Sequence, residues 1–353
     1  MEFGLSDAQL LLRDSIRGLL DQRSSVERVR EIMDTDAAHD PDLLGALGEQ
    51  GVTGLLVDER WGGVGLGLLD AAVAAQEMGR AVTPLCFDAS FVLAPLLVEA
   101  AASDEERERW LPGIAGGETI VAPLLGAAFD RGRLQAHDLF VPAAHVADAL
   151  LVQAGEQAWL IPRDTDGLDI RTLFNVDETR RFAEVTLDHE PDEDWRLAGS
   201  LDAPELDRAV QAARIALAAD AVGACYRAIE IAVEYAQQRE QFGRIIASFQ
   251  AVKHLCAEMI ADVDPIQSLV WQAAWAWDQR DADAAWLAPL LKAHASEIGT
   301  RTVTTATQVF GGMGFTWECD MHLYYKRVGY DRQMLGGPVE MRALAAERQF
   351  GTA

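Results

Sequence analysis

The chain has 353 residues, half of them apolar, and carries 56 acidic against 30 basic side chains, which gives a formal net charge of -26. This length allows a substantial core divided over two or three domains, and the apolar content excludes a disordered chain. The charge argues against nucleic acid or an anionic membrane as a partner, because both bind clustered cations. A few local arginines could still form a pocket for an anionic ligand.

Neither the cysteines nor the N-terminus indicates a metal site, a disulfide framework or a targeting segment. The four cysteines are widely separated and form no metal-ligand or redox spacing, so we expect free thiols in a reducing compartment. The first residues lack a basic segment followed by an apolar one. No uncharged run approaches the roughly 20 residues of a membrane span. We therefore expect a cytoplasmic protein without a metal.

Residues 1–117 are predicted to form an all-helical N-terminal domain. Ser6 and Gln9 have the spacing of a capping box, and the apolar residues that follow keep helical period. A second helix is expected from Pro41 to about Gly51. The glycine-rich segment that follows it has no strand pattern before it, so we interpret it as an inter-helix loop and not as a nucleotide loop. Further helical segments are predicted at residues 70–80 and 104–110.

Residues 118–198 are predicted to form a small β-barrel or sandwich, because short β-type runs alternate there with Gly, Pro and Asp. These runs are Thr119–Ala122, Leu139–Pro142, Ala149–Val152, Ala158–Ile161 and Ala183–Leu187.

Residues 199–353 are predicted to form a C-terminal four-helix bundle. Its long helical patterns cover about 205–238, 247–280, 283–310 and 338–350, and Pro265 is expected to kink or interrupt the second of them. Helices, then strands, then a helical block make an α+β fold, not alternating βα units.

Two stretches of this C-terminal block stand where a helical pattern gives way to glycine. The first is Tyr235–His254, with Arg-Glu-Gln-Phe-Gly at its centre, and the second is Gln308–Glu318, which contains Gly-Gly-Met-Gly. Both resemble the signatures of the acyl-CoA dehydrogenase family, and they occur in the family's order. The segment Thr316–Arg327 is similar to that of an actinobacterial branch whose members act on bulky or sterol side-chain CoA thioesters.

The resemblance implies an FAD-dependent enzyme of this fold, with the flavin lying across a subunit interface. The residues expected to hold the ADP half of a neighbour's FAD are Arg239, Gln241, Phe242, Ile246, Phe249, Gln250, Gln308, Gly311 and Gly312. Arginine suits phosphate oxygens, and paired glycines let backbone amides approach closely. Phe242 and Phe249 could equally be core residues, and His322 is interpreted as structural.

The catalytic base of the family is missing. In the family a carboxylate takes the proton α to the thioester, at one of two positions, and here these positions hold Leu335 and Ala213. Neither side chain can accept a proton. Arg214, next to Ala213, does match the family pattern.

The flavin-ring side also departs from the family. About 80 residues separate Gly117 from Ser200, fewer than in the usual β-domain, and Val121–Asp130 replaces the family's ring-contacting stretch. We therefore predict a subunit of an α2β2 heterotetramer, in which a homologous acyl-CoA dehydrogenase subunit supplies the ring site and the catalytic Glu. The resemblance further implies an acyl-CoA substrate and an electron-transfer flavoprotein as acceptor.

Two alternatives remain open. The chain could be a self-sufficient dehydrogenase whose base lies elsewhere, with Glu205, Asp207 and Glu318 as candidates. It could also be a scaffold or binding protein of the same fold without redox chemistry.

Overall fold

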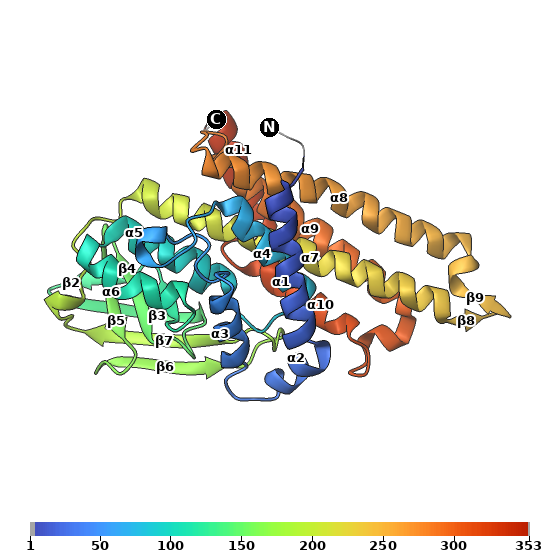
Figure 1. Ribbon diagram of the computed structural model, residues 1–353, viewed down its shortest axis with the longest axis horizontal. Helices are drawn as coiled ribbons and strands as arrows, with labels where there is room; N and C mark the ends of the chain where they lie inside the picture. Colours follow the sequence, from blue (N-terminus) through green and yellow to red (C-terminus); the bar gives the residue numbers. More distant parts are fainter. Residues whose placement is uncertain (1–3, 352–353) are drawn as a thin grey trace. The chain divides into compact units, whose positions relative to one another are not determined.

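A computed structural model describes residues 4–351, which form two compact units (Figure 1). Within the described residues, the first unit comprises the chain up to Val29, the segment Ala72–Thr83 and everything from Arg214 onward. The second unit comprises Arg30–Ala71 and Pro84–Ala213. The predicted three-domain boundaries stay a prediction from sequence order.

The first unit is built from long helices packed around α9 (Ala284–Phe310), which contacts α8, α10 and α11 (Figure 1). Its other elements are α1 (Asp7–Arg23), the larger part of α4 (Leu68–Arg80), most of α7 (Ala203–Gln238), β8 (Glu240–Gln241), β9 (Arg244–Ile245), η4 (Ile246–Ser248), α8 (Gln250–Asp278), η5 (Gly311–Phe315), α10 (Met321–Gln333) and α11 (Pro338–Phe350).

Local signals in the sequence explain two of these helices. The capping box forms at the start of α1, where the Gln9 amide donates to the Ser6 hydroxyl at 3.3 Å and the Ser6 amide donates to the Gln9 side chain at 3.0 Å. Helix α8 continues through Pro265 without an interruption, and a kink at this residue stays a prediction. A proline deprives the carbonyl four residues earlier of its partner. That residue, Ala261, is exposed like Pro265 itself, so water can satisfy the freed carbonyl.

Helices α4 and α7 approach closely because glycines lie where they cross. A Cβ atom on Gly79 would lie 1.9 Å from the carbonyl oxygen of Asp220, and one on Gly223 would lie 1.8 Å from that of Gln76. Any side chain at either position would therefore push the helices apart.

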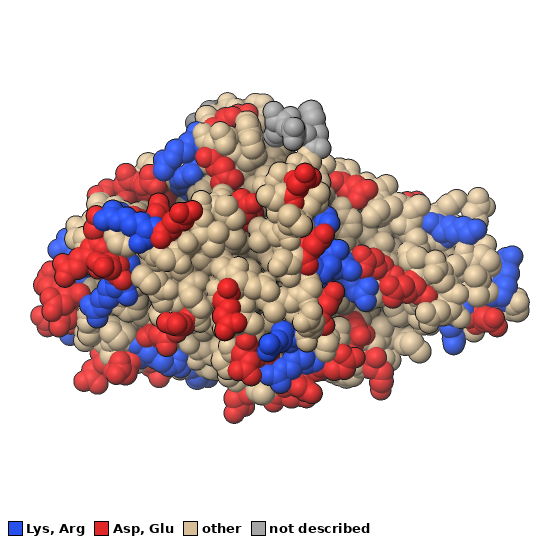
Figure 2. Space-filling view, in the orientation of Figure 1, with Lys and Arg blue, Asp and Glu red and all other residues tan. Residues whose placement is uncertain are grey.

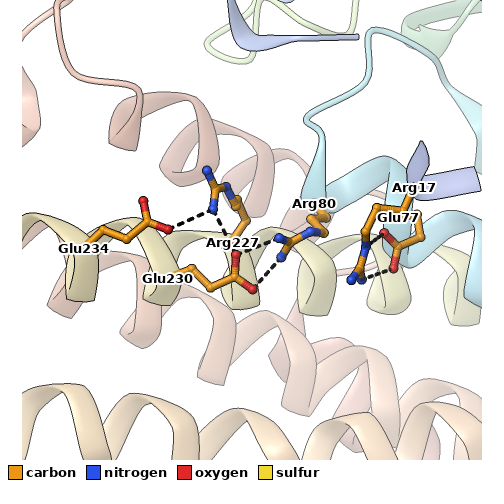
Figure 3. Close-up of polar contacts among 6 residues, drawn as sticks. All are labelled: Arg17, Glu77, Arg80, Arg227, Glu230 and Glu234. Atoms are coloured by element: carbon orange, nitrogen blue, oxygen red, sulfur yellow. Dashed lines mark hydrogen bonds and ion pairs between the residues drawn. The ribbon is translucent and has the colours of Figure 1, made fainter. Parts of the chain in front are cut away.

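Ion pairs then tie α1 and α7 to α4 (Figure 3). Arg17 on α1 binds both oxygens of the buried Glu77 on α4, at 2.7 and 2.8 Å. Arg80 at the end of α4 binds both oxygens of Glu230 on α7, each at 2.7 Å. Arg227 also donates to Glu230, at 3.0 Å. Bidentate pairs of this kind fix the orientation of the helices as well as their proximity.

The second unit contains two sheets and the remaining helices. One sheet has the order β1-β4-β5 and the other β2-β3-β7-β6, and every strand pair is antiparallel except β1 with β4. The strands are β1 (Val121–Leu124), β2 (Ala128–Asp130), β3 (Arg133–Pro142), β4 (Ala149–Ala154), β5 (Gln157–Pro162), β6 (Leu168–Leu173) and β7 (Phe182–His189). The helical elements are α2 (Val26–Met33, which begins in the first unit), α3 (Pro41–Glu49), η1 (Glu59–Trp61), the start of α4, the π-helical η2 (Asp88–Leu93), α5 (Ala94–Ala101), α6 (Asp104–Ala115), η3 (Glu193–Trp195) and the start of α7.

The α+β fold class is confirmed, but the sequence did not predict every element. Helix α10 was not predicted because its buried face includes charged residues, so its sequence lacks the apolar pattern of a helix. Arg327 has no exposed surface, donates to the Thr83 carbonyl at 2.8 Å and pairs with the buried Asp220 at 3.4 Å. Residues 4–351 contain no helix that is both long and apolar enough to span a membrane.

Candidate functional site

The first of the two predicted stretches forms a hairpin that follows directly on α7. Helix α7 ends at Gln238, and β8 then pairs with β9 so that Glu240 lies opposite Ile245 and Gln241 opposite Arg244. The turn between the strands is made by Phe242 and Gly243, with φ angles of 53° and 76°. Two successive positive φ values are those of a type I′ hairpin turn, which glycine adopts freely and phenylalanine does not.

The two phenylalanines of this stretch play different roles. Phe242 is 92% exposed, so it is not a core residue of this chain. Phe249 is half-buried, and its ring meets that of Phe242 edge to face with centroids 6.1 Å apart. A large aromatic side chain held out in a strained backbone conformation is suited to contact a ligand or another subunit.

The second stretch begins at the end of α9. Gly311 has φ 65° and ψ -143°, a conformation essentially restricted to glycine. A Cβ atom added to Gly311 or Gly312 would meet nothing within 4 Å, so their backbone is open to an incoming group. Gln308, one turn earlier on α9, is exposed.

One aromatic contact brings the two stretches to the same end of the first unit. Tyr235 in the last turn of α7 stacks on Phe310 at the end of α9, with ring centroids 4.3 Å apart and an angle of 19° between the planes. The hairpin and the glycine turn therefore follow directly on two helix ends that touch. The sequence order alone, with some 70 residues between the stretches, could not show this.

The electrostatics of this end suit an anion. Arg239 and Arg244 are both exposed, and within residues 4–351 neither forms an ion pair with a carboxylate. In Figure 2 acidic and basic side chains are both spread over the visible face, and basic side chains outnumber acidic ones at the end that carries β8 and β9. Helix α8 starts after Phe249 without a side-chain cap, so its first amides add positive potential there. The residues present thus fit the diphosphate of FAD.

The structure shows what occupies the two family positions of the base. Ala213 is fully buried in α7. Leu335 lies in the loop between α10 and α11 with φ 53°, and its carbonyl accepts a hydrogen bond of 2.9 Å from Nε of Arg214. Lys292, also buried, donates to the carbonyls of Arg332 and Gly336 on either side of this residue, each at 3.2 Å. The loop is firmly held, and its central side chain cannot take a proton.

The alternative bases lie elsewhere. Glu205 and Asp207 are in the first turns of α7, where Asp207 accepts a hydrogen bond from Gln211 at 2.6 Å. At 1.5 Å per residue, Asp207 is about 9 Å along the helix from Ala213. Glu318 is exposed, and its pKa is lowered by hydrogen bonds from its own amide and from Thr316. An exposed carboxylate with a lowered pKa is a weak base, the opposite of a carboxylate activated by burial.

His322 packs on a neighbouring aromatic residue. Its ring meets that of Trp317 edge to face, with centroids 4.8 Å apart, and Lys326 lies 4.2 Å from the centre of the same Trp317 ring. The interpretation of His322 as structural stays a prediction. Within residues 4–351 no group of three or more His, Cys, Asp or Glu side chains could hold a metal ion.

Arg244 is the residue of this end that sequence reasoning missed. Its signal was present, since Phe-Gly in a two-residue turn places the residue after it directly opposite Gln241. Its guanidinium carbon lies 4.1 Å from the centre of the Phe249 ring.

Comparison with known proteins identifies the family of this chain. The model of the acyl-CoA dehydrogenase N-terminal domain matches residues 6–118, and that of the C-terminal domain matches residues 206–350. Acyl-CoA dehydrogenase IpdE2 of Mycolicibacterium smegmatis is 31% identical over 346 residues, which cover 97% of this chain and 99% of that protein. The protein of the same name from Mycobacterium tuberculosis is 33% identical over 339 residues, 96% of each chain.

Solved structures agree with this assignment. A variant of the Tcur3481-Tcur3483 steroid ACAD superposes with a TM-score of 0.87 at 26% identity and covers 97% of each chain. The ChsE4-ChsE5 complex from Mycobacterium tuberculosis has the same fold, with a TM-score of 0.91 at 24% identity and full coverage of both chains. The chain belongs to the acyl-CoA dehydrogenase family. This confirms the predicted fold, the enzyme class and FAD as the cofactor.

Proposed function

We propose that this chain is the subunit of a heteromeric acyl-CoA dehydrogenase that supplies the ADP-binding half of the FAD site. A homologous partner subunit would supply the flavin-ring site and the carboxylate that takes the α-proton of the acyl-CoA thioester. FAD, when bound, supplies the acceptor for the β-hydride. The chain's own part is to bind and orient the nucleotide half of that cofactor.

The observation that carries this proposal is the Leu335 loop. Arg214 and Lys292 hold its backbone through three carbonyls, yet the side chain presented at its centre is an aliphatic one. A proton acceptor must stand within hydrogen-bond reach of the proton that it abstracts, and leucine has no such group. The loop therefore holds its shape without a base at its centre, and we infer that the partner subunit supplies the base.

The nucleotide end supports the other half of the proposal. Arg239 is exposed and has no carboxylate partner within the described residues, so its guanidinium is available to a phosphate. Gly311 and Gly312 leave room for a ligand to approach the backbone. Gln241 and Gln308 are both exposed and offer amide donors and acceptors.

The substrate is proposed to be a bulky acyl-CoA thioester. One structural relative above 25% identity is a steroid ACAD with a paired designation, which also favours a two-chain assembly here. The segment Thr316–Arg327 points to the same branch of the family. An electron-transfer flavoprotein is the proposed acceptor of the electrons.

The test is to purify the chain alone and after coexpression with a homologous subunit that retains Glu in the corresponding loop. We expect flavin absorbance and acyl-CoA oxidation only in the coexpressed complex, with one FAD per heterodimer. A chain that is yellow and active alone would instead identify a self-sufficient dehydrogenase. Absence of flavin in both preparations would identify a scaffold without redox chemistry.

A further inference from the structure

Arg244 lies on the same face of the hairpin as three of the residues predicted to bind the nucleotide. Gln241 is paired with Arg244, and the Ile246 amide donates to the Arg239 carbonyl at 2.8 Å, which continues the pairing by one step. Side chains alternate between the two faces of a strand, and directly opposed residues share a face. Arg239, Gln241, Arg244 and Ile246 therefore point to one side of the hairpin.

The guanidinium of Arg244 is held in place by an aromatic ring. Its carbon lies 4.1 Å from the centre of the Phe249 ring, a cation–π distance. Phe249 is itself fixed by the start of α8 and by its contact with Phe242. A guanidinium that rests on a ring keeps its N–H groups at the edge of the plane, free to bind an anion.

Arg239 and Arg244 lie close together in sequence and have no acidic partner within residues 4–351, although the chain is strongly acidic. Acidic side chains outnumber basic ones by 56 to 30, and several arginines of the first unit pair with them, such as Arg301 with Asp262 at 2.6 Å. Arg239 and Arg244, five positions apart, form no such pair within residues 4–351. Two neighbouring arginines kept free of carboxylates favour a ligand that carries more than one negative charge.

We propose that Arg244 is a second ligand of the FAD diphosphate and binds it together with Arg239. This inference rests on the proposed nucleotide-binding role of this end of the chain. The diphosphate carries two negative charges, and two guanidinium groups on one face of the hairpin balance both of them. Arg244 thereby sets a preference for FAD over flavins that lack the ADP portion.

The test uses the coexpressed complex with Arg244→Ala, Arg244→Lys or Arg239→Ala in this chain. Arg301→Ala, which removes an arginine paired with Asp262, is the matched control. Flavin is removed from each complex, and the Kd values for FAD, ADP and adenosine are measured by titration at several salt concentrations. Subunit association is followed by light scattering.

We expect Arg244→Ala to weaken FAD and ADP binding by about 10- to 100-fold, to leave adenosine binding unchanged and to reduce the salt dependence of FAD affinity. Arg244→Lys keeps the positive charge but lacks the paired N–H donors of a guanidinium, so its FAD affinity should be intermediate. Normal FAD affinity in Arg244→Ala with weakened affinity in Arg239→Ala would overturn this inference and leave the proposed function standing. Normal affinity in both variants would overturn both. Loss of subunit association with unchanged ADP affinity would make Arg244 an intersubunit contact instead.

Discussion

Replacing Arg239 by alanine separates nucleotide binding from chemistry. The side chain is exposed and has no carboxylate partner in the described chain, and the hydrogen bond of 2.9 Å from its amide to Tyr235 does not need the side chain. We therefore expect the free energy of unfolding to change by no more than about 0.5 kcal/mol. A charge-assisted contact with phosphate contributes about 1.5–3 kcal/mol, so FAD affinity should fall about 10- to 150-fold.

The assay is flavin absorbance per heterodimer together with turnover per bound flavin, both measured while FAD is titrated back. Because the base and the ring site are proposed to lie in the partner subunit, turnover per bound flavin should stay nearly constant as occupancy falls. Arg301→Ala should leave both quantities unchanged. Full occupancy combined with lost turnover would place Arg239 in the chemistry and refute the division of labour.

Three further outcomes are expected. Leu335→Glu in the isolated chain should not produce flavin reduction by acyl-CoA, because the residues of the ring site would still be absent; reduction at a rate near that of family enzymes would contradict this. Arg17→Ala should destabilise the chain by about 3 kcal/mol in urea unfolding, because it leaves the carboxylate of the buried Glu77 without its guanidinium partner. Arg13→Ala, which removes an exposed ion pair with Asp14, should change the free energy of unfolding by less than about 1 kcal/mol. Equal effects of the two variants would show that burial of Glu77 does not set the cost. Burial lowers the pKa of His145 to about 4, so the unfolded chain takes up a proton on this histidine at a higher pH than the folded chain does, and stability should fall as the pH drops from about 6.5 to 4. The urea midpoint of unfolding should therefore fall less steeply over this pH range in His145→Gln than in the unchanged chain. Parallel curves would refute the assignment of this pH dependence to His145.

Periodicity predicted the long helices because their buried faces are apolar. It failed for α10, where the buried positions include Arg327 and Asp331 as well as Leu323 and Val328. From the sequence alone, a charged residue that is buried with an ion-pair partner cannot be distinguished from one that is exposed to solvent. Only the fold brings Asp220 on α7 next to Arg327, and the helical face becomes recognisable once that pair is known.

The candidate site was predictable to the extent that it depends on local sequence. The glycine break predicted at Arg-Glu-Gln-Phe-Gly is the turn of the hairpin, and the φ of 65° at Gly311 explains that glycine. The Tyr235–Phe310 stack, which joins the two stretches, links residues 75 positions apart (310 - 235) and has no signal of its own. Recognising Arg244 depended on the hairpin itself, since its pairing with Gln241 follows only once Phe242 and Gly243 are known to form the turn.

The Leu335 loop supports the proposal that this chain shares its function with a partner subunit. A loop that had lost its base and had no other role would not require charged side chains to bind its carbonyls. Instead, Arg214 binds the Leu335 carbonyl, and the buried ammonium of Lys292 donates to the Gly336 carbonyl and to that of Arg332 at the end of α10. Burying an ammonium is costly unless its protons are bound, so this arrangement stabilises the turn only in its present shape. A firmly held loop, two arginines without carboxylate partners in the described residues and no proton acceptor at either base position are what we would expect of the proposed subunit that completes a partner's flavin site.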